Sequence, residues 1–196
     1  MKKIMAGMWV ENERMGQRTL VVRLPAETGG SSYVIEYFCQ PFKGKGAQPI
    51  HYHLFYTEHF EILAGKARYQ LGKEELTAPA GSRVTLPPGI AHLHPWSDSS
   101  EVLHVRQTVE ANPPDLSGLN ACINTGITLC GLAQDGKVGK DGLPGLLQLA
   151  VSAQSTFPGT YSPGLSIGAQ RSIIGLLALL GRAAGYRTSY PNYGAV

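Results

Sequence analysis

Short runs of alternating apolar and polar residues fill positions 17 to 109 of the chain. Turn-like pairs, Gly65-Lys66 and Gly72-Lys73, separate some of them. An alternation with a period of two is typical of β-strands, because successive side chains point to opposite faces of a sheet. The expected strands are 17–24, 33–40, 60–64, 67–71, 75–78, 83–87, 91–96 and 101–109. Strands this short and evenly spaced predict a sandwich or barrel and leave no place for βαβ units.

The two ends of the chain follow other patterns. Residues 1–16 are expected to be an irregular lead-in, in which Met8, Trp9 and Val10 anchor onto the barrel. After Glu110, apolar residues recur at steps of three and four, which is typical of helices. We therefore expect a β-barrel over 1–110 and a helical extension over 111–196, packed on the barrel or on a partner subunit.

Three helices are expected in the extension. Asp115 is a candidate N-cap of the first, and Pro144 suits the first turn of the second, over about 146–151. The third is expected over about 169–184, with Gly185 as its C-cap. The apolar face of the first helix consists of Leu116, Leu119, Ile123, Ile127 and Cys130. The stripe of the third consists of Ile173, Leu176, Leu177 and Leu180.

The apolar run 173–180 raises the question of membrane contact. Arg171, Arg182 and Arg187 flank it. A helix that spans a bilayer needs about 20 apolar residues, and this run is well short of that length. A helix lying in the membrane interface is the alternative. We expect this helix to pack on the barrel or on a partner subunit and expect no membrane contact.

The composition describes an ordinary globular protein of 196 residues, 43% hydrophobic and 16% charged. That length allows one sizeable core. The net charge is only +3 and the basic residues form no runs, so we expect no nucleic-acid partner. Cys39, Cys122 and Cys130 form no close pair, which argues against a disulfide framework. Glu11 and Glu13 end the N-terminal apolar run too early for a secretory signal, so a cytoplasmic location is expected.

The candidate chemistry lies between residues 49 and 96. His51 and His53 are two apart in a strand-like run, so their imidazoles leave from the same face. A hairpin-like return would bring Glu58 beside them on the neighbouring strand, and His92 follows a turn signal at 87–89. Three imidazoles and one carboxylate suit iron, manganese, nickel, copper or zinc. Four protein ligands leave open positions for water, oxygen or substrate.

Two motifs in this stretch resemble those of the cupin superfamily. The first is His51-x-His53-x4-Glu58-x6-Gly65, and the second is Gly81-x5-Pro87-x-Gly89-x2-His92. The second lacks the asparagine that ends the family's motif. The resemblance implies an all-β jelly-roll barrel, single in this chain, that holds a divalent metal inside through His51, His53, Glu58 and His92. It also implies a homodimer.

Other polar residues are weaker candidates for substrate contact or catalysis. His94 is two residues past His92, so a continuing strand would place it on the ligand side as a base or a substrate contact. His104 and Arg106 share one face of the last strand, and there Arg106 could hold a carboxylate if that face points inward. Tyr56 and Tyr69 could line the cavity. Two further residues have lesser roles: Glu61 as the alternative carboxylate and His59 as the least favoured ligand.

Two classes of function follow. The first is a metal-dependent enzyme acting on a small organic molecule, most simply a dioxygenase-type oxidoreductase, in which iron, manganese, nickel or zinc binds the substrate in its open positions. The same site could run isomerase, decarboxylase or lyase chemistry. The second is a non-catalytic module that binds a metal or a small metabolite. The wall and loop residues that separate these functions vary within one fold.

Overall fold

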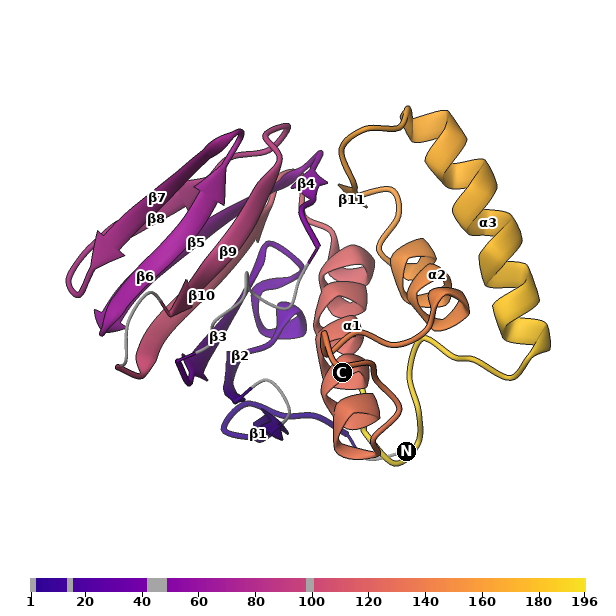
Figure 1. Cartoon of the computed structure of the whole chain (residues 1–196), viewed down its shortest axis with the longest axis horizontal. Helices are drawn as coiled ribbons and strands as arrows, with labels where there is room; N and C mark the ends of the chain where they lie inside the picture. Colours follow the sequence, from indigo (N-terminus) through magenta and orange to yellow (C-terminus); the bar gives the residue numbers. More distant parts are fainter. Residues whose placement is uncertain (1–2, 14–15, 42–48, 98–100) are drawn as a thin grey trace.

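The strands build two facing sheets, which confirms the predicted all-β jelly-roll barrel with a C-terminal helical extension (Figure 1). The computed structural model describes residues 3–13, 16–41, 49–97 and 101–196. The larger sheet is antiparallel, in the order β1-β2-β3-β10-β5-β8. Its strands are β1 (Trp9–Asn12), β2 (Gln17–Arg23), β3 (Ser32–Cys39), β5 (Tyr56–Ala64), β8 (Arg83–Leu86) and β10 (Leu103–Ala111).

The smaller sheet is assembled from two pieces. β6 (Lys66–Leu71) lies between β7 (Glu74–Pro79) and β9 (His92–Ser97), and β4 (Tyr52–His53) pairs with β11 (Thr160–Tyr161). Backbone hydrogen bonds of 2.7 and 3.2 Å between His51 and His92 join the two pieces. Because β11 comes from the C-terminal extension, the extension adds an edge strand to the barrel.

The alternation along the strands decides which side chains fill the barrel. In β10, Leu103, Val105 and Gln107 are buried, whereas Arg106 between them is exposed. Side chains from both sheets meet in one core cluster, which includes Tyr37, Phe60, Ile62, Ala67, Ala78, Leu86 and Leu103. A second apolar cluster lies on the other side of the buried polar residues: along β5 Glu58 lies between Tyr56 and Phe60, and along β10 Gln107 lies between Val105 and Val109. The polar residues therefore form a layer within the barrel.

The lead-in is more regular than the sequence suggested. Residues Trp9–Asn12 form β1, which pairs with β2 at the edge of the larger sheet. The strand has four residues, too few for a periodic pattern to stand out. Part of the predicted lead-in, residues 1–2 and 14–15, lies outside the described residues.

Helix α1 (Leu116–Gln134) packs directly on the barrel. Asp115 caps it as predicted, because its Oδ1 accepts a hydrogen bond of 2.8 Å from the N–H of Gly118. Leu119, Ile123 and Ile127 are buried in a cluster with residues of the larger sheet. In the described part of the chain, α1 alone is long and apolar enough to cross a membrane. Its buried face, which includes Leu119, Ile123 and Ile127, packs on the larger sheet.

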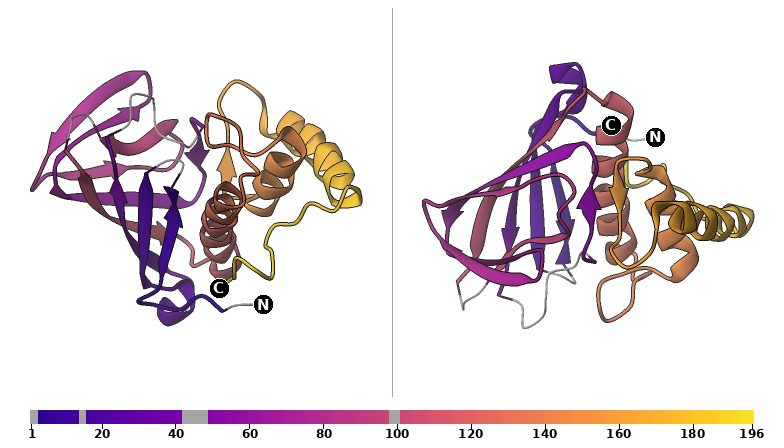
Figure 2. Two further views of the ribbon diagram at one scale, coloured as in Figure 1. Left: turned by 60° about the horizontal axis from the view of Figure 1, so that its bottom comes forward. Right: turned by 90° about the horizontal axis from the view of Figure 1, so that it is seen from above.

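The other helices lie outside α1. They are α2 (Leu146–Ser155) and α3 (Ile167–Ala183), and a short 3-10 helix, Pro25–Thr28, precedes β3. Figure 2 shows α3 on the side of α2 that is away from the strands. Pro144 stands just ahead of the N-cap Gly145 and not inside the first turn of α2.

Helix α3 does not bury the face that its sequence favoured. The expected stripe residues Ile173, Leu176 and Leu180 are 50, 61 and 51% exposed. The buried positions are instead Gln170, Ala178 and Gly181. A Cβ on Gly181 would lie 2.8 Å from the Leu147 carbonyl oxygen, so glycine lets the backbones of α2 and α3 approach closely. Of the expected stripe only Leu177 packs, half-buried, against the cluster of Ala150, Val151 and Ala178, and the other three residues are left on the outer face.

Candidate metal centre

Five side chains from both sheets converge in the polar layer of the barrel. They are His51, His53, Glu58, His92 and His94, and one donor atom of each lies within 4.8 Å of every other. The smaller sheet supplies the four imidazoles, from β4, β9 and the residue before β4, and β5 of the larger sheet supplies the carboxylate. The four predicted ligands are therefore brought together, and His94 joins them.

The route by which Glu58 reaches the histidines differs from the expected hairpin. β5 does not pair with β4; it pairs with β10 and β8 in the opposite sheet. The chain bends at residues 54–55 and crosses from one sheet to the other. The carboxylate consequently faces the histidines across the barrel interior and does not lie beside them on a neighbouring strand.

Hydrogen bonds at Nδ1 orient three of the rings. His51 Nδ1 lies 2.9 Å from the Pro49 carbonyl oxygen, and His92 Nδ1 lies 2.8 Å from that of Ile90. A carbonyl oxygen only accepts, so both rings carry their hydrogen on Nδ1 and keep the lone pair of Nε2 for the cluster. His53 Nδ1 lies 2.9 Å from Thr160 Oγ1. Burial lowers the pKa of His51 well below its ordinary value, and the neighbouring His94 and His53 lower it further.

Glu58 is ionised in the middle of this cluster. Burial alone would raise its pKa, but the imidazoles of His94 and His53 outweigh that effect and hold the pKa well below its ordinary range. Gln107 Nε2 donates a hydrogen bond of 2.8 Å to Glu58 Oε1. On the other side, Oε2 lies 2.8 Å from His94 Nε2 and 3.1 Å from His92 Nε2.

The donor atoms of the cluster lack ordinary hydrogen bonds. Four buried atoms have no partner of acceptable geometry within the described chain: His53 Nε2, Glu58 Oε2, His92 Nε2 and His94 Nε2. Buried polar atoms are rarely left unsatisfied, because desolvation is unfavourable. A divalent ion would satisfy the atoms of His53, Glu58 and His92 and would leave His94 Nε2 to a ligand beside it; imidazole with carboxylate is a donor set that first-row transition metals accept. The residues present therefore fit the implied metal.

Two residues of the site were missed from the sequence. Gln107 is 3% exposed and holds Glu58; its signal was a polar residue among the inward-facing apolar positions of its strand. Thr160 belongs to β11, directly opposite His53 in the sheet register. Nothing in the sequence near Thr160 marks it as part of the site.

Tyr56 lies beside the cluster without being open to a substrate. Its side chain is fully buried, 5.4 Å from the ring of His53, and its hydroxyl donates a hydrogen bond of 2.7 Å to Asp115 Oδ2. Burial raises the pKa of Tyr56 well above its usual value, and Asp115 adds to the effect. The hydroxyl therefore ties the barrel to the cap of α1.

We expect Tyr56→Phe to lower the free energy of unfolding by about 1–2 kcal/mol, because it leaves a carboxylate oxygen of Asp115 without its donor. Metal content should stay unchanged. Denaturant unfolding measures the first quantity and elemental analysis the second. Tyr69→Phe is the control, with an expected change within about 0.5 kcal/mol. Loss of metal in Tyr56→Phe would place Tyr56 in the site instead.

The remaining candidates lie away from the cluster. Tyr69 packs against the apolar cluster that contains Tyr37 and Phe60. His104 and Arg106 are on the outer face of β10, where both bind the carboxylate of Glu36 at distances of 2.8 and 2.6 Å. Among the lesser candidates, Glu61 pairs with Arg83 at 3.0 Å, and His59 contacts Thr85. The structure does not bring these residues to the site.

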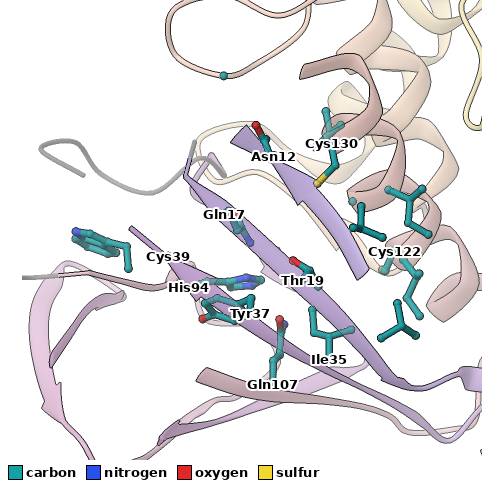
Figure 3. Close-up of a pocket in the computed structure, with 18 of the residues that line it drawn as sticks. Asn12, Gln17, Thr19, Ile35, Tyr37, Cys39, His94, Gln107, Cys122 and Cys130 are labelled. Carbon is teal, nitrogen blue, oxygen red and sulfur yellow. The ribbon is translucent and has the colours of Figure 1, made fainter. Parts of the chain in front are cut away.

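A cavity of about 190 Å³ adjoins the cluster at His94 (Figure 3). Residues of the barrel line one side, among them Thr19, Tyr37 and Gln107, and residues of α1 line the other, among them Cys122 and Cys130. The helical extension thus contributes a wall to the cavity as well as Thr160 to the cluster.

Comparison with known proteins supports the fold only. No protein-family model and no curated protein matches the chain. Solved structures do match, and cupin-superfamily proteins are among them, as the two motifs predicted. One is a sugar phosphate isomerase from Silicibacter pomeroyi, 20% identical, with a TM-score of 0.42 over 52% of this chain and 64% of that one.

Two other matches are similarly distant. A protein from Thermotoga maritima, described as a predicted oxalate decarboxylase, is 13% identical with a TM-score of 0.44, over 53% of this chain and 99% of its own. A Streptomyces nucleoside dehydratase is 16% identical with a TM-score of 0.39, over 52% of this chain and 80% of its own. The chain spans only 59% and 64% of two structures described as sugar phosphate isomerases. At these identities and TM-scores the matches carry no argument about activity.

Proposed function

We propose that the protein is a metal-dependent enzyme of the dioxygenase type, which oxidises a small organic molecule inside the barrel. The observation that carries the proposal is the set of buried donor atoms in His53, Glu58, His92 and His94, which lack hydrogen-bond partners in the described chain and adjoin a cavity. A site of this kind is what a catalytic metal with open positions requires.

His51, His53, Glu58 and His92 would hold the ion, which is iron, manganese, nickel or zinc. When bound, such an ion supplies Lewis acidity, and iron also supplies the activation of oxygen. His94 lies in both the cluster and the cavity wall, so its Nε2 can give or take a proton at a substrate held there. The walls of the cavity around that proton are mainly apolar.

His94 favours a second candidate function. A base beside a metal that stabilises an enediolate is the arrangement for an isomerase, decarboxylase or lyase. A non-catalytic module that binds a metal or a metabolite remains the alternative from another class. Oxygen uptake separates the first candidate from the second, and turnover of any kind separates both from the module.

We also propose a domain organisation, a cellular location and an oligomeric state for the protein. We place a barrel unit at 1–110 and a helical unit at 111–196, in a cytoplasmic protein with no nucleic-acid or membrane partner. A homodimer is part of the proposal, because the apolar outer face of α3 at Ile173, Leu176 and Leu180 is exposed and a subunit interface would cover it. Light scattering of the purified protein tests the dimer.

The test of the proposal is the metal content of protein purified without chelator. We expect about one transition-metal ion per chain by elemental analysis. His51→Ala should lose the ion, because it removes one donor. His59→Ala is the matched control, since His59 lies on the same stretch of chain with its ring half exposed on the outer face. A wild-type protein that stays metal-free after reconstitution would overturn the proposal.

A further inference from the structure

The cavity beside the metal cluster has a chemical character of its own. It lies between the interior of the larger sheet, β9 and α1 (Figure 3). We infer that it binds an uncharged, mainly apolar organic molecule of about one ring, with the molecule's polar end at His94 and Gln107. That this molecule is the substrate rests on the proposed function, whereas the binding site itself does not.

Among the described residues, no lysine, arginine, aspartate or glutamate side chain lines the cavity. Three thiols do: burial raises the pKa of Cys39, Cys122 and Cys130 to about 12, so they are neutral at pH 7. A buried phosphate or carboxylate needs cationic or N–H partners to offset its lost hydration. These walls offer no cationic side chain to a charged ligand.

The cavity has mainly apolar walls and few polar side chains. Most lining residues are apolar, and Asn12, Gln17 and Thr19 add polar groups on the side of β1 and β2. His94 Nε2 differs from these because it is buried without a hydrogen-bond partner of acceptable geometry in the described chain. At the end of the cavity next to the cluster, His94 Nε2 lies 2.8 Å from Glu58 Oε2. Gln107 donates a hydrogen bond to the other oxygen of that carboxylate. Pockets that bind small molecules combine apolar walls with a few placed polar groups. The polar end of the ligand therefore lies next to the metal site.

The cavity volume of about 190 Å³ is below the range of about 300–1,000 Å³ that is usual for drug-sized ligands. An apolar protein cavity of about 150 Å³ holds one benzene molecule. The space therefore suits one ring or a short hydrocarbon chain and excludes a nucleotide.

Gly126 offers a direct test, because it lines the cavity from α1 and a Cβ built on it meets nothing within 4 Å. Gly126→Leu should fill the cavity with little strain. Gly168→Leu is the matched control, since Gly168 is in α3, is exposed, and also has open space at its Cβ. If the leucine variant of Gly126 does not fold, Gly126→Ala takes its place, because alanine is the better helix former and still reduces the volume.

The probes are benzyl alcohol, benzoate and phenyl phosphate, titrated by ligand-observed NMR into metal-loaded and metal-stripped protein. We expect benzyl alcohol to bind both forms at least about tenfold more tightly than phenyl phosphate, and the stripped form tenfold more tightly than benzoate. Gly126→Leu should weaken this binding at least about tenfold and leave the metal content unchanged. Gly168→Leu should change neither quantity.

Three results would overturn the inference: no binding of benzyl alcohol, equal binding of the charged probes to stripped protein, or binding that Gly126→Leu leaves intact. A different combination of results would contradict the proposed function alone. If the protein takes up no metal but binds benzyl alcohol in a manner sensitive to Gly126→Leu, the enzyme proposal fails and the site for a neutral ligand stands.

Discussion

Replacing Glu58 with alanine is expected to lower the affinity for divalent transition metals at least about a hundredfold. Even an outer hydrogen-bond partner of a metal ligand accounts for about 10–100-fold in affinity, and Glu58 is the one carboxylate in the cluster. Its ionised form supplies the negative charge that the imidazoles lack. Competition with a chromophoric chelator measures the affinity, and elemental analysis measures the stoichiometry.

Glu61→Ala is the control for Glu58→Ala. Glu61 is on the same strand, but its side chain points outward and pairs with Arg83 at 3.0 Å. We expect its removal to leave the metal affinity unchanged. Equal losses in the two variants would indicate a general effect on β5, and unchanged affinity in Glu58→Ala would remove Glu58 from the ligand set.

Spacing along the chain was enough to predict that the four proposed ligands come together. His51 and His53 reach the cluster because residues two apart share a face of a strand. His92 and His94 repeat the same relation on β9, which the bridge between His51 and His92 holds in register. Local geometry of this kind is readable from sequence, since it depends on one strand at a time. It does not reveal which sheet supplies the carboxylate.

Contacts between distant segments could not be predicted. Thr160 stands 107 positions from His53, and its placement depends on how the whole helical extension folds back on the barrel. The orientation of α3 is a similar case. Gln170 is buried because its amide bonds the Ser162 and Leu165 carbonyls at 2.8 Å, while leucines face outward. Periodicity gives an amphipathic helix its two faces, but tertiary contacts decide which one is covered.

Thr160 brings the extension into contact with the candidate metal centre. With a hydrogen on His53 Nδ1, the Thr160 hydroxyl accepts it at 2.9 Å and leaves the Nε2 lone pair for the ion. Its backbone is fixed by pairing between β11 and β4. Valine keeps the shape and strand preference of threonine but cannot accept that hydrogen bond. Thr160→Val therefore removes the hydroxyl, with its hydrogen bonds to His53 and Cys122, and keeps the packing.

We expect Thr160→Val to weaken metal binding about 10–100-fold while thermal unfolding of the metal-free protein changes little. Thr85→Val is the matched control, because Thr85 makes the same contact, at 3.0 Å, with the Nδ1 of His59 outside the site. If both variants bind metal as the wild type does, the hydrogen bond to His53 has no role in holding the ion. If only Thr160→Val is impaired, the helical extension belongs to the metal centre, since it supplies the residue that fixes the tautomer of His53.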